Sequence, residues 1–316
     1  MLPSPADILA AAYRLRGVTE RTPLIRSTAL SARVGTNVWL KCENLQRTGS
    51  FKLRGATNAL AALSDEQRAR GVVASSAGNH GLGVAHAARA LGVRALIFVP
   101  ATAPEVKRRG IVALGASVDD SQPDYDAAHH AAQAYAREHG MSFVNPCAGD
   151  ALLAGQGTVA LEIIEELPTA CTFVVPVGGA GLVGGMAALI RAVLPAARIV
   201  GVQSEATNAM TASLASGARV DVPVLPTLAD GLAGQIDDEG FAIGRVSIDA
   251  MVLVRETEIA ESIRWLAREH ELRVEGAGAV ATAALLHGLV PDLAAPVVAV
   301  ISGGNVDDAR WRAIVE

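Results

Sequence analysis

Short runs of apolar, β-branched residues alternate with longer segments of helical periodicity along the whole chain. The short runs predict strands at residues 38–41, 72–75, 94–99, 142–144, 172–177, 198–203 and 297–301. The longer segments predict helices at residues 80–91, 104–114, 125–139, 151–167, 182–194, 259–270 and 278–287, with 48–63 a loop that leads into a helix. Because the strands lack alternating polarity, they indicate parallel sheets covered by helices on both faces. The predicted fold class is therefore α/β.

The chain has 316 residues, which is enough for two domains of ordinary size. No linker-like stretch, internal repeat or low-complexity segment divides it. We therefore expect interleaved domains rather than two consecutive ones. Residues 1–16 predict an amphipathic helix rather than a signal peptide, and no run is long and apolar enough to span a membrane.

Composition narrows the class of function. Hydrophobic residues make up 51% and charged residues 19%, as in a globular protein. A net charge of −5 argues against a nucleic-acid partner, which would require a basic surface. The cysteines Cys42, Cys147 and Cys171 fit neither a disulfide framework nor a zinc pattern. We expect a cytoplasmic protein that acts on a small molecule, without a metal and without a membrane partner.

A glycine-rich loop follows one strand and precedes one helix, with the sequence Gly178-Gly179-Ala180-Gly181. Ligands of parallel sheets bind beyond the carboxyl ends of the strands. Small residues there let backbone amides approach an anion, and the start of a helix adds partial positive charge. The loop therefore predicts a phosphate site; the alternative is a tight turn that binds nothing.

The same loop admits a second interpretation. Gly179, Gly181 and Gly184 satisfy the dinucleotide pattern G-x-G-x-x-G, and Glu205 lies where a ribose-binding acid is expected. An NAD-dependent dehydrogenase is therefore a competing hypothesis. A Walker-type ATPase is excluded because no lysine follows the loop.

A second loop, Ser-Ser-Ala-Gly-Asn-His-Gly at residues 75–81, also joins a predicted strand to a helix. Its hydroxyls and its amides at a helix start could hold a carboxylate. The alternative is that Asn79 serves only as the N-cap of the helix and that His80 is a structural histidine.

The chain has only three lysines. Lys52 lies beside an aromatic ring in Thr-Gly-Ser-Phe-Lys-Leu-Arg-Gly at residues 48–55, which suits a covalent bond to a carbonyl cofactor. Taken alone, a lysine in such a segment is more often an ordinary surface lysine. Lys41 lies within a predicted strand and Lys107 on a charged helix face, so Lys52 is the best candidate for lysine chemistry.

The order and spacing of these loops resemble one known family, the fold-type II pyridoxal-phosphate enzymes, in their threonine/serine dehydratase (ammonia-lyase) and serine racemase branch. The resemblance covers about residues 5–308. Its main segments are Asn-Leu-Gln-Arg-Thr-Gly-Ser-Phe-Lys-Leu-Arg-Gly at 44–55, Ser-Ala-Gly-Asn-His at 76–80 and Pro-Val-Gly-Gly-Ala-Gly-Leu at 176–182, with further matches at 154–158, 228–231 and 302–307.

The resemblance implies a fold like that of the tryptophan synthase β chain, with mainly parallel sheets flanked by helices. It implies a large pyridoxal-phosphate-binding domain from residues 1–68 and 147–316, and a small mobile domain from residues 69–146. A homodimer or homotetramer that acts on an amino acid is expected.

The resemblance also assigns roles to individual residues. Lys52 would be the catalytic lysine that binds pyridoxal 5'-phosphate. The other cofactor-binding residues would be Phe51 against the ring, Asn79 at the 3'-oxygen, Gly178, Gly179, Ala180, Gly181 and Leu182 at the phosphate, and Ser302 at the ring nitrogen. The substrate carboxylate would be held by Ser76, the amide of Ala77, Asn79 and His80.

The implied reaction is β-elimination from a β-hydroxy amino acid, chiefly L-threonine or L-serine, to 2-oxobutanoate or pyruvate plus ammonia. Lys52 would remove the α-proton. Ala77 stands where racemases of this branch carry a second hydroxyl acid, which disfavours serine racemase as the alternative. Gln203 and Ala209 stand where the racemase-type metal site has acidic residues, so that site looks degraded.

Residues 275–278, Glu-Gly-Ala-Gly, depart from the usual Glu-Pro-Thr/Ala-Gly. A dehydratase for a specialised substrate, such as a hydroxyaspartate, a phenylserine or a hydroxyectoine-derived amino acid, therefore stays open. A non-catalytic amino-acid-binding protein is disfavoured because Lys52 and Ser302 are retained. Because the chain ends soon after residues 303–305, no regulatory domain is expected.

Overall fold

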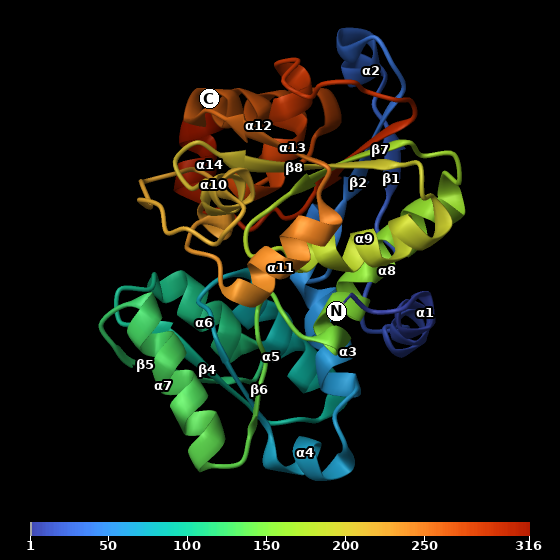
Figure 1. Cartoon of the computed structure of the whole chain (residues 1–316). Coiled ribbons are helices and arrows are strands. Elements are labelled where there is room, and N and C mark those ends of the chain that lie inside the picture. The colour runs from blue at the N-terminus through green and yellow to red at the C-terminus, as the bar shows by residue number, and fades with distance from the viewer. Residues whose placement is uncertain (1) are drawn as a thin grey trace.

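Two separate β-sheets organise the chain in the computed structural model, which describes residues 2–316 (Figure 1). The six-stranded sheet has the strand order β1-β2-β10-β7-β8-β9, and the four-stranded sheet has the order β5-β4-β3-β6. The strands are β1 (Leu24–Arg26), β2 (Val38–Cys42), β3 (Val72–Ser75), β4 (Ala95–Pro100), β5 (Ser117–Gln122), β6 (Ser142–Phe143), β7 (Thr172–Pro176), β8 (Arg198–Ser204), β9 (Ala250–Val254) and β10 (Val297–Ile301).

Helices connect nearly all of these strands. The α-helices are α1 (Pro5–Arg14), α2 (Thr28–Val34), α3 (Lys52–Ala61), α4 (Asp65–Arg70), α5 (Asn79–Leu91), α6 (Glu105–Ala113), α7 (Tyr125–Glu138), α8 (Asp150–Glu166), α9 (Gly181–Val193), α10 (Ala209–Ser216), α11 (Asp238–Ser247), α12 (Glu256–His270), α13 (Gly276–Leu286) and α14 (Asp308–Val315). Two 3₁₀ turns, η1 (Glu43–Leu45) and η2 (Asp230–Leu232), complete the described part of the chain. No helix within residues 2–316 combines the length and apolarity needed to cross a membrane.

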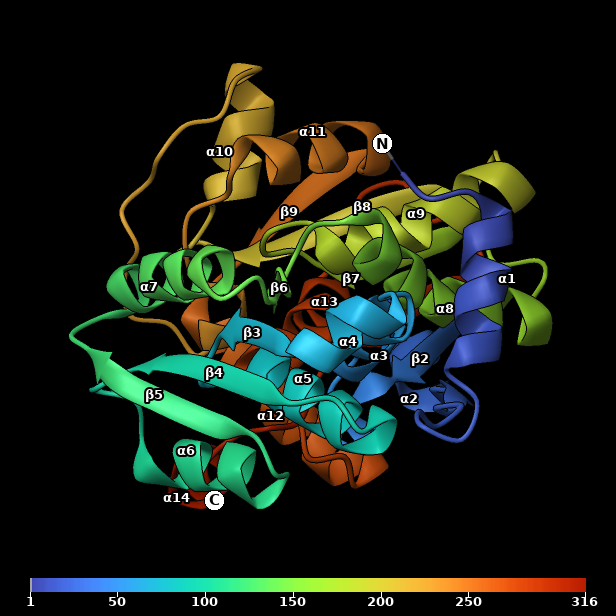
Figure 2. The same ribbon diagram turned by 90° about the horizontal axis from the view of Figure 1, so that it is seen from below.

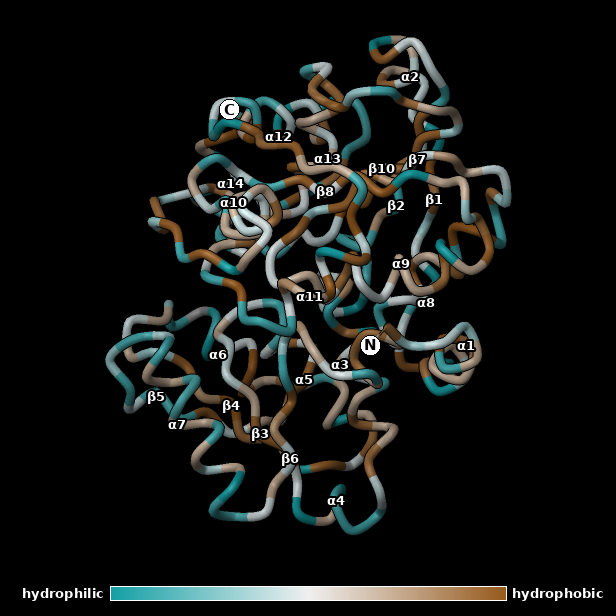
Figure 3. Tube along the Cα trace, in the orientation of Figure 1, coloured by the Kyte–Doolittle hydropathy of each residue, from teal (hydrophilic) through white to brown (hydrophobic). Residues whose placement is uncertain are grey.

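The six-stranded sheet is buried on both faces. Residues of α1, α8 and α9 form one apolar cluster with the sheet, and residues of α12 and α13 form a second cluster with its other face. All residues of α13 are buried, which explains its uniformly apolar and small-residue sequence. Figure 3 shows the hydrophobic residues concentrated at the strands of both sheets.

The four-stranded sheet is also covered on both faces. In Figure 2, α7 lies on one side of this sheet while α5 and α6 lie on the other. Residues of α3 join the apolar cluster of α5, and α3 also packs against α8. Helix α3 therefore connects the two sheets. The domain boundaries at residues 69 and 147 stay a prediction.

The predicted α/β class is confirmed, and each predicted strand is present with its ends shifted by no more than a few residues. The expectation of parallel pairing holds except for β1, which pairs antiparallel with β2. Strand β5 was not predicted because its sequence, Ser-Val-Asp-Asp-Ser-Gln, is polar; the strand lies at the sheet edge with its side chains half-buried or exposed. At such an edge only one side of the backbone must be paired, so polar residues are tolerated.

Candidate active site

Lys52 is the first residue of α3 and follows a loop fixed to the end of β10. The Phe51 amide donates to the Ser302 carbonyl at 3.1 Å, and Ser50 pairs with Gly303 in an isolated β-bridge. The Lys52 ammonium donates to the Pro146 carbonyl at 2.7 Å and lies 3.9 Å from Cys147 Sγ. The Phe51 ring centre lies 5.2 Å from the same nitrogen. The amine therefore faces the loop between β6 and α8 rather than bulk solvent.

A buried ion-pair network holds the first turn of α3 in place. Arg54 binds Glu43 through two hydrogen bonds of 2.8 Å and Glu162 through bonds of 2.7 and 2.8 Å. Lys41 is fully buried and pairs with Glu162 at 2.6 Å. Burial alone would raise the pKa of Glu43, but the Arg54 guanidinium lowers it below its ordinary value. These contacts leave Lys41 no free amine for chemistry.

The glycine-rich loop between β7 and α9 lies against Cys147. A Cβ atom at Gly179 would come within 2.7 Å of Cys147 Sγ, and one at Gly181 within 2.9 Å of the Cys147 carbonyl oxygen. Ala180 has a φ of +66°, in the left-handed region that normally favours glycine. Because Cys147 also contacts Lys52, the thiol lies between the reactive amine and the start of α9.

Asn79 is held by two side chains from distant parts of the chain. Its amide nitrogen donates to Glu275 Oε1 at 2.7 Å, and Asn305 Nδ2 donates to Asn79 Oδ1 at 2.7 Å and to the Thr48 carbonyl at 2.7 Å. The N-cap of α5 is Gly78, without a side-chain cap. The alternative that Asn79 serves only as an N-cap is therefore wrong.

Glu275, at the N-terminus of α13, was not among the predicted site residues. Its side chain is buried, and burial raises its pKa to about 8, although the hydrogen bond from Asn79 opposes that shift. The carboxyl group is thus mostly protonated at neutral pH. A Cβ atom at Gly276 would lie 2.0 Å from the Leu228 carbonyl oxygen, so the residue after Glu275 must be glycine here. The sequence signal that could have identified Glu275 is a glutamate directly before an apolar helix.

His80 has a structural contact. Its Nε2 bonds the Val144 carbonyl at 2.9 Å, while its buried Nδ1 has no partner within the described residues. Burial, and the Lys52 charge to a lesser degree, lower the pKa of His80 to about 3. A neutral ring fixed in this way cannot supply positive charge to a carboxylate.

The remaining predicted residues surround the same space. Ser302 directly follows β10 and is buried. Within residues 2–316, its hydroxyl makes only a long 3.4 Å contact, to the Ala277 carbonyl. Ser76 Oγ accepts a 3.1 Å bond from the Gly78 amide, which closes the loop before α5. Ala77 is half-buried in that loop, and Leu182 is buried in the first turn of α9. The carboxyl ends of β3, β7 and β10 thus deliver the predicted residues to one place.

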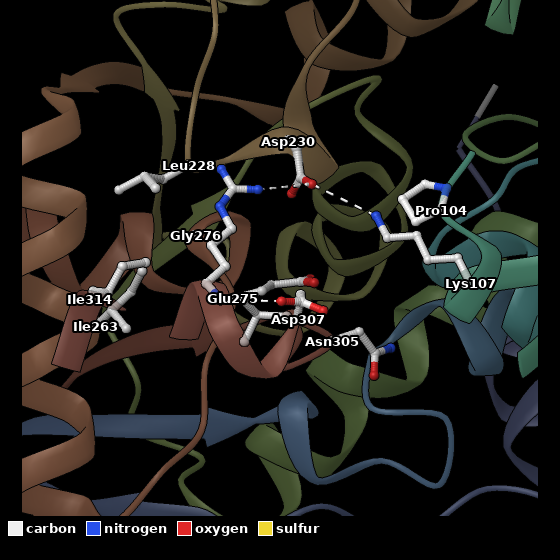
Figure 4. A pocket seen from close by; sticks show the side chains of 12 residues that line it. Pro104, Lys107, Leu228, Asp230, Ile263, Glu275, Gly276, Asn305, Asp307 and Ile314 are labelled. Atoms are coloured by element: carbon white, nitrogen blue, oxygen red, sulfur yellow. Dashed lines mark hydrogen bonds and ion pairs between the residues drawn. The ribbon is translucent and has the colours of Figure 1, made fainter. Parts of the chain in front are cut away.

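A cavity of about 220 Å³ adjoins Glu275 and Asn305 (Figure 4). Asp230, on η2, lies 3.9 Å from Lys107 of α6 and 3.6 Å from Arg310 of α14. These three charges link the helix beside the four-stranded sheet to the C-terminal helix. Glu205, the acid expected by the dehydrogenase hypothesis, is exposed at the end of β8.

Comparisons with known proteins agree on one family. The model described as "Pyridoxal-phosphate dependent enzyme" matches residues 15–303. The chain is 44% identical to the L-threonine ammonia-lyase of Geobacter sulfurreducens over 96% of this chain and 76% of that protein. The structure of maize serine racemase is similar with a TM-score of 0.94 and 32% identity, over 99% and 97% of the two chains. The processed form of threonine deaminase isoform 2 from Solanum lycopersicum gives 0.92 and 35%, over 98% and 85%.

Proposed function

The chain belongs to the family of pyridoxal-phosphate dependent enzymes, and we propose that it is an ammonia-lyase that acts on L-threonine and L-serine. The products are 2-oxobutanoate or pyruvate and ammonia. The observation that carries the proposal is the Lys52 amine, which faces Cys147 beside the Gly178–Gly181 loop. The similarity to L-threonine ammonia-lyases over nearly the whole chain supports the substrate.

The described residues fit the cofactor. The loop at Gly179 has no room for a Cβ, and its amides at the start of α9 suit a phosphate group. Among the described residues, the Ser302 hydroxyl makes only a long contact, so it can donate to a ring nitrogen. When bound, pyridoxal phosphate supplies an electron-withdrawing ring that stabilises negative charge at the substrate's Cα.

We assign the cofactor contacts as follows. Lys52 Nζ would hold the carbonyl carbon, Phe51 would pack against the ring, and Asn79 would contact the 3'-oxygen. Because Glu275 and Asn305 fix the Asn79 side chain, its amide is oriented before a ligand arrives. The phosphate would be held by Gly178, Gly179, Ala180, Gly181 and Leu182.

Lys52 also acts as the base. With pyridoxal phosphate and substrate bound, Lys52 Nζ would take the α-proton, and the β-hydroxyl would leave as water by gaining a proton that the Lys52 ammonium can return. The unsaturated amine that is released gains water and loses ammonia in solution, which yields the 2-oxo acid. Ser76, Asn79, His80 and the Ala77 amide are assigned to the substrate carboxylate. Because the His80 ring is neutral and tied to Val144, we assign its backbone rather than its ring to this contact.

Two alternatives have specific support. The likeness to maize serine racemase favours racemisation, but Ala77 offers no hydroxyl that could exchange a proton on the second face of the substrate. Gly276, which stands where a proline is usual, packs tightly against Leu228. The wall beside Glu275 therefore differs from the usual one, which favours a specialised β-hydroxy amino acid. The NAD-dependent dehydrogenase loses its support with the family assignment.

The test is a 2-oxo acid assay of the purified holoenzyme with L-threonine, L-serine, D-serine and specialised β-hydroxy amino acids. We expect 2-oxobutanoate from L-threonine and pyruvate from L-serine, together with a spectral change of the bound cofactor. If the enzyme converts only a specialised β-hydroxy amino acid, that amino acid is its substrate in place of L-threonine and L-serine. A holoenzyme that forms no 2-oxo acid from any of them would overturn the proposal.

We further propose a cytoplasmic homodimer or homotetramer in which residues 69–146 move as a unit. The free thiols of Cys42, Cys147 and Cys171 suit a reducing compartment. Exposed apolar side chains on α1, Leu9 and Tyr13, suit a subunit contact. Light scattering of the eluted holoenzyme tests the oligomer, and a monomer at micromolar concentration would contradict it.

A further inference from the structure

The Asn305 side chain connects the loop before α3 to the start of α5. Its Nδ2 donates two hydrogen bonds of 2.7 Å, one to the Thr48 carbonyl and one to Asn79 Oδ1. Its own Oδ1 lies against Gly49, where a Cβ atom would come within 2.3 Å of it. Asn305 also lines the cavity beside Glu275 (Figure 4). The two bonds use both protons of the Asn305 amide.

These bonds decide which way round the Asn79 amide lies. A backbone carbonyl can only accept a hydrogen bond, so the atom of Asn305 that faces Thr48 must be its nitrogen. The same nitrogen faces Asn79, so the Asn79 atom opposite it must be the carbonyl oxygen. The Asn79 nitrogen is then left to donate to Glu275 Oε1 at 2.7 Å. The direction of the whole chain of bonds is thus set at the Thr48 carbonyl.

Glu275 could not set this direction by itself. Burial raises its pKa to about 8, so it carries a proton at neutral pH, and a protonated carboxyl group can either donate or accept. With Glu275 alone, the Asn79 amide could lie either way round. With Asn305 in place, one proton of Asn79 Nδ2 goes to Glu275, and the other has no partner within residues 2–316. That second proton is available to a ligand.

We propose that Asn305 is a positioning residue that makes Asn79 present an N–H, rather than a carbonyl oxygen, to the 3'-oxygen of the cofactor. This inference rests on the cofactor contacts assigned with the proposed function. An N–H donor stabilises a negatively charged 3'-oxygen, whereas a carbonyl oxygen in its place would require the 3'-oxygen to keep its proton. Because Thr48 and Lys52 belong to one short segment, the segment that carries the reactive amine also sets the polarity of the contact to the ring oxygen.

The test is the absorption spectrum of the holoenzyme without substrate, together with titration of the apoenzyme with pyridoxal phosphate. In Asn305→Asp the new carboxylate cannot donate, so we expect the Asn79 amide to turn round and offer its oxygen to the cofactor. The visible band of the bound cofactor should then move to shorter wavelength, because the 3'-oxygen keeps its proton. The dissociation constant should rise about tenfold to 100-fold. Asn305→Ala removes the donor without reversing the contact and should give a mixture of both bands.

Asn37→Asp is the matched control, because Asn37 is an exposed asparagine whose oxygen accepts a 2.8 Å bond from Arg26 that an aspartate can keep. We expect its spectrum and dissociation constant to equal those of the wild type. In an Asn79→Leu background, Asn305→Asp should change the dissociation constant by less than about twofold, because no amide remains to be turned.

An unchanged band in both Asn305 variants, or an equal effect of Asn305→Asp with and without the Asn79 amide, would overturn the inference. A wild-type holoenzyme that shows the visible band but forms no 2-oxo acid from any β-hydroxy amino acid would instead overturn the proposed function. The spectra of the Asn305 variants would still decide the inference in that case.

Discussion

The Asn79 amide donates a 2.7 Å hydrogen bond to Glu275 Oε1, which joins the start of α5 to the start of α13. These helices belong to different sheets, so the bond crosses between the two halves of the molecule (Figure 1). Its acceptor is a carboxyl group whose pKa is raised to about 8 by burial. The orientation of Asn79 and the ionisation of Glu275 are therefore coupled.

This coupling predicts a pH dependence of stability. Burial raises the pKa of Glu275 from 4.5 to about 8, so the folded protein binds a proton that the unfolded chain releases in this interval. The free energy of unfolding should fall as pH rises through the interval, by about 1.4 kcal/mol per pH unit at most. In Glu275→Gln the fall should be absent. Urea unfolding at several pH values checks this, and parallel curves for the two proteins would contradict it.

Lys52→Ala should abolish turnover, with a loss of about 10⁴-fold or more in kcat. It should also remove the visible absorption of bound pyridoxal phosphate, since neither other lysine can replace the amine. The fold should persist, because within residues 2–316 Lys52 Nζ makes one short hydrogen bond, to the Pro146 carbonyl, and one long contact, to Cys147 Sγ. Lys107→Ala is the control and should keep the absorption band. A coloured, active Lys52→Ala protein would disprove the assignment.

Ala77→Ser should allow some racemisation. The substitution places a hydroxyl in the loop before Asn79, where the native residue has no proton to exchange. L-Serine incubated with this variant should yield D-serine beside pyruvate, while the wild type yields pyruvate alone. Chiral chromatography is the measurement. Absence of D-serine from an otherwise active variant would refute our interpretation of this position.

Gly179→Ala should weaken cofactor binding about tenfold to 100-fold, because its Cβ would lie 2.7 Å from Cys147 Sγ. Cys147→Gly in the same chain should restore much of the affinity by removing the thiol. Gly181→Ala provides the comparison, because its clash is with the Cys147 carbonyl oxygen at 2.9 Å, which no side-chain change removes. Titration of the apoenzyme with pyridoxal phosphate measures each dissociation constant. If Cys147→Gly restored cofactor affinity equally in Gly179→Ala and Gly181→Ala, the contact between residue 179 and the Cys147 thiol would not explain the loss.

Arg54→Met should destabilise the protein by about 3–5 kcal/mol, because it leaves the buried carboxylate of Glu43 without its cation. Adding Glu43→Gln should recover part of the loss by removing the unpaired charge. Arg54 also binds Glu162, which keeps its bond to Lys41 in either variant. Urea denaturation of the single and double variants tests this, and purely additive losses would show that the two side chains are not coupled.

Those parts of the candidate site whose residues lie close together in the sequence could be predicted. The Gly178–Gly181 loop and the segment around Lys52 each combine their informative residues within a few positions, at a strand end or a helix start. The α/β fold was predictable for the same reason, since most of its strands are short apolar runs, with the polar edge strand β5 as the exception. The assigned roles of the site residues remain to be tested by the variants above.

What the sequence did not reveal depends on contacts between distant segments. Glu275 acquires its raised pKa only after folding buries it beside Asn79, 196 positions earlier in the chain. Cys147 carries no motif, yet it separates Lys52 from the glycine-rich loop. His80 was expected near the carboxylate, but the hydrogen bond between its ring and the Val144 carbonyl depends on where β6 ends, which the sequence did not reveal.

The scarcity of lysine affects how an aldehyde cofactor is loaded onto this protein. Aldehydes condense with unhindered amines wherever they meet them, and such side reactions compete with delivery to the correct position. Here Lys41 is enclosed and paired with Glu162, Lys107 lies beside Asp230, and the other basic side chains are guanidinium groups or imidazoles, which do not retain aldehydes in this way. A free aldehyde that reaches the folded chain thus meets few side-chain amines that compete with Lys52. Formation of the holoenzyme is therefore favoured over random modification of the surface.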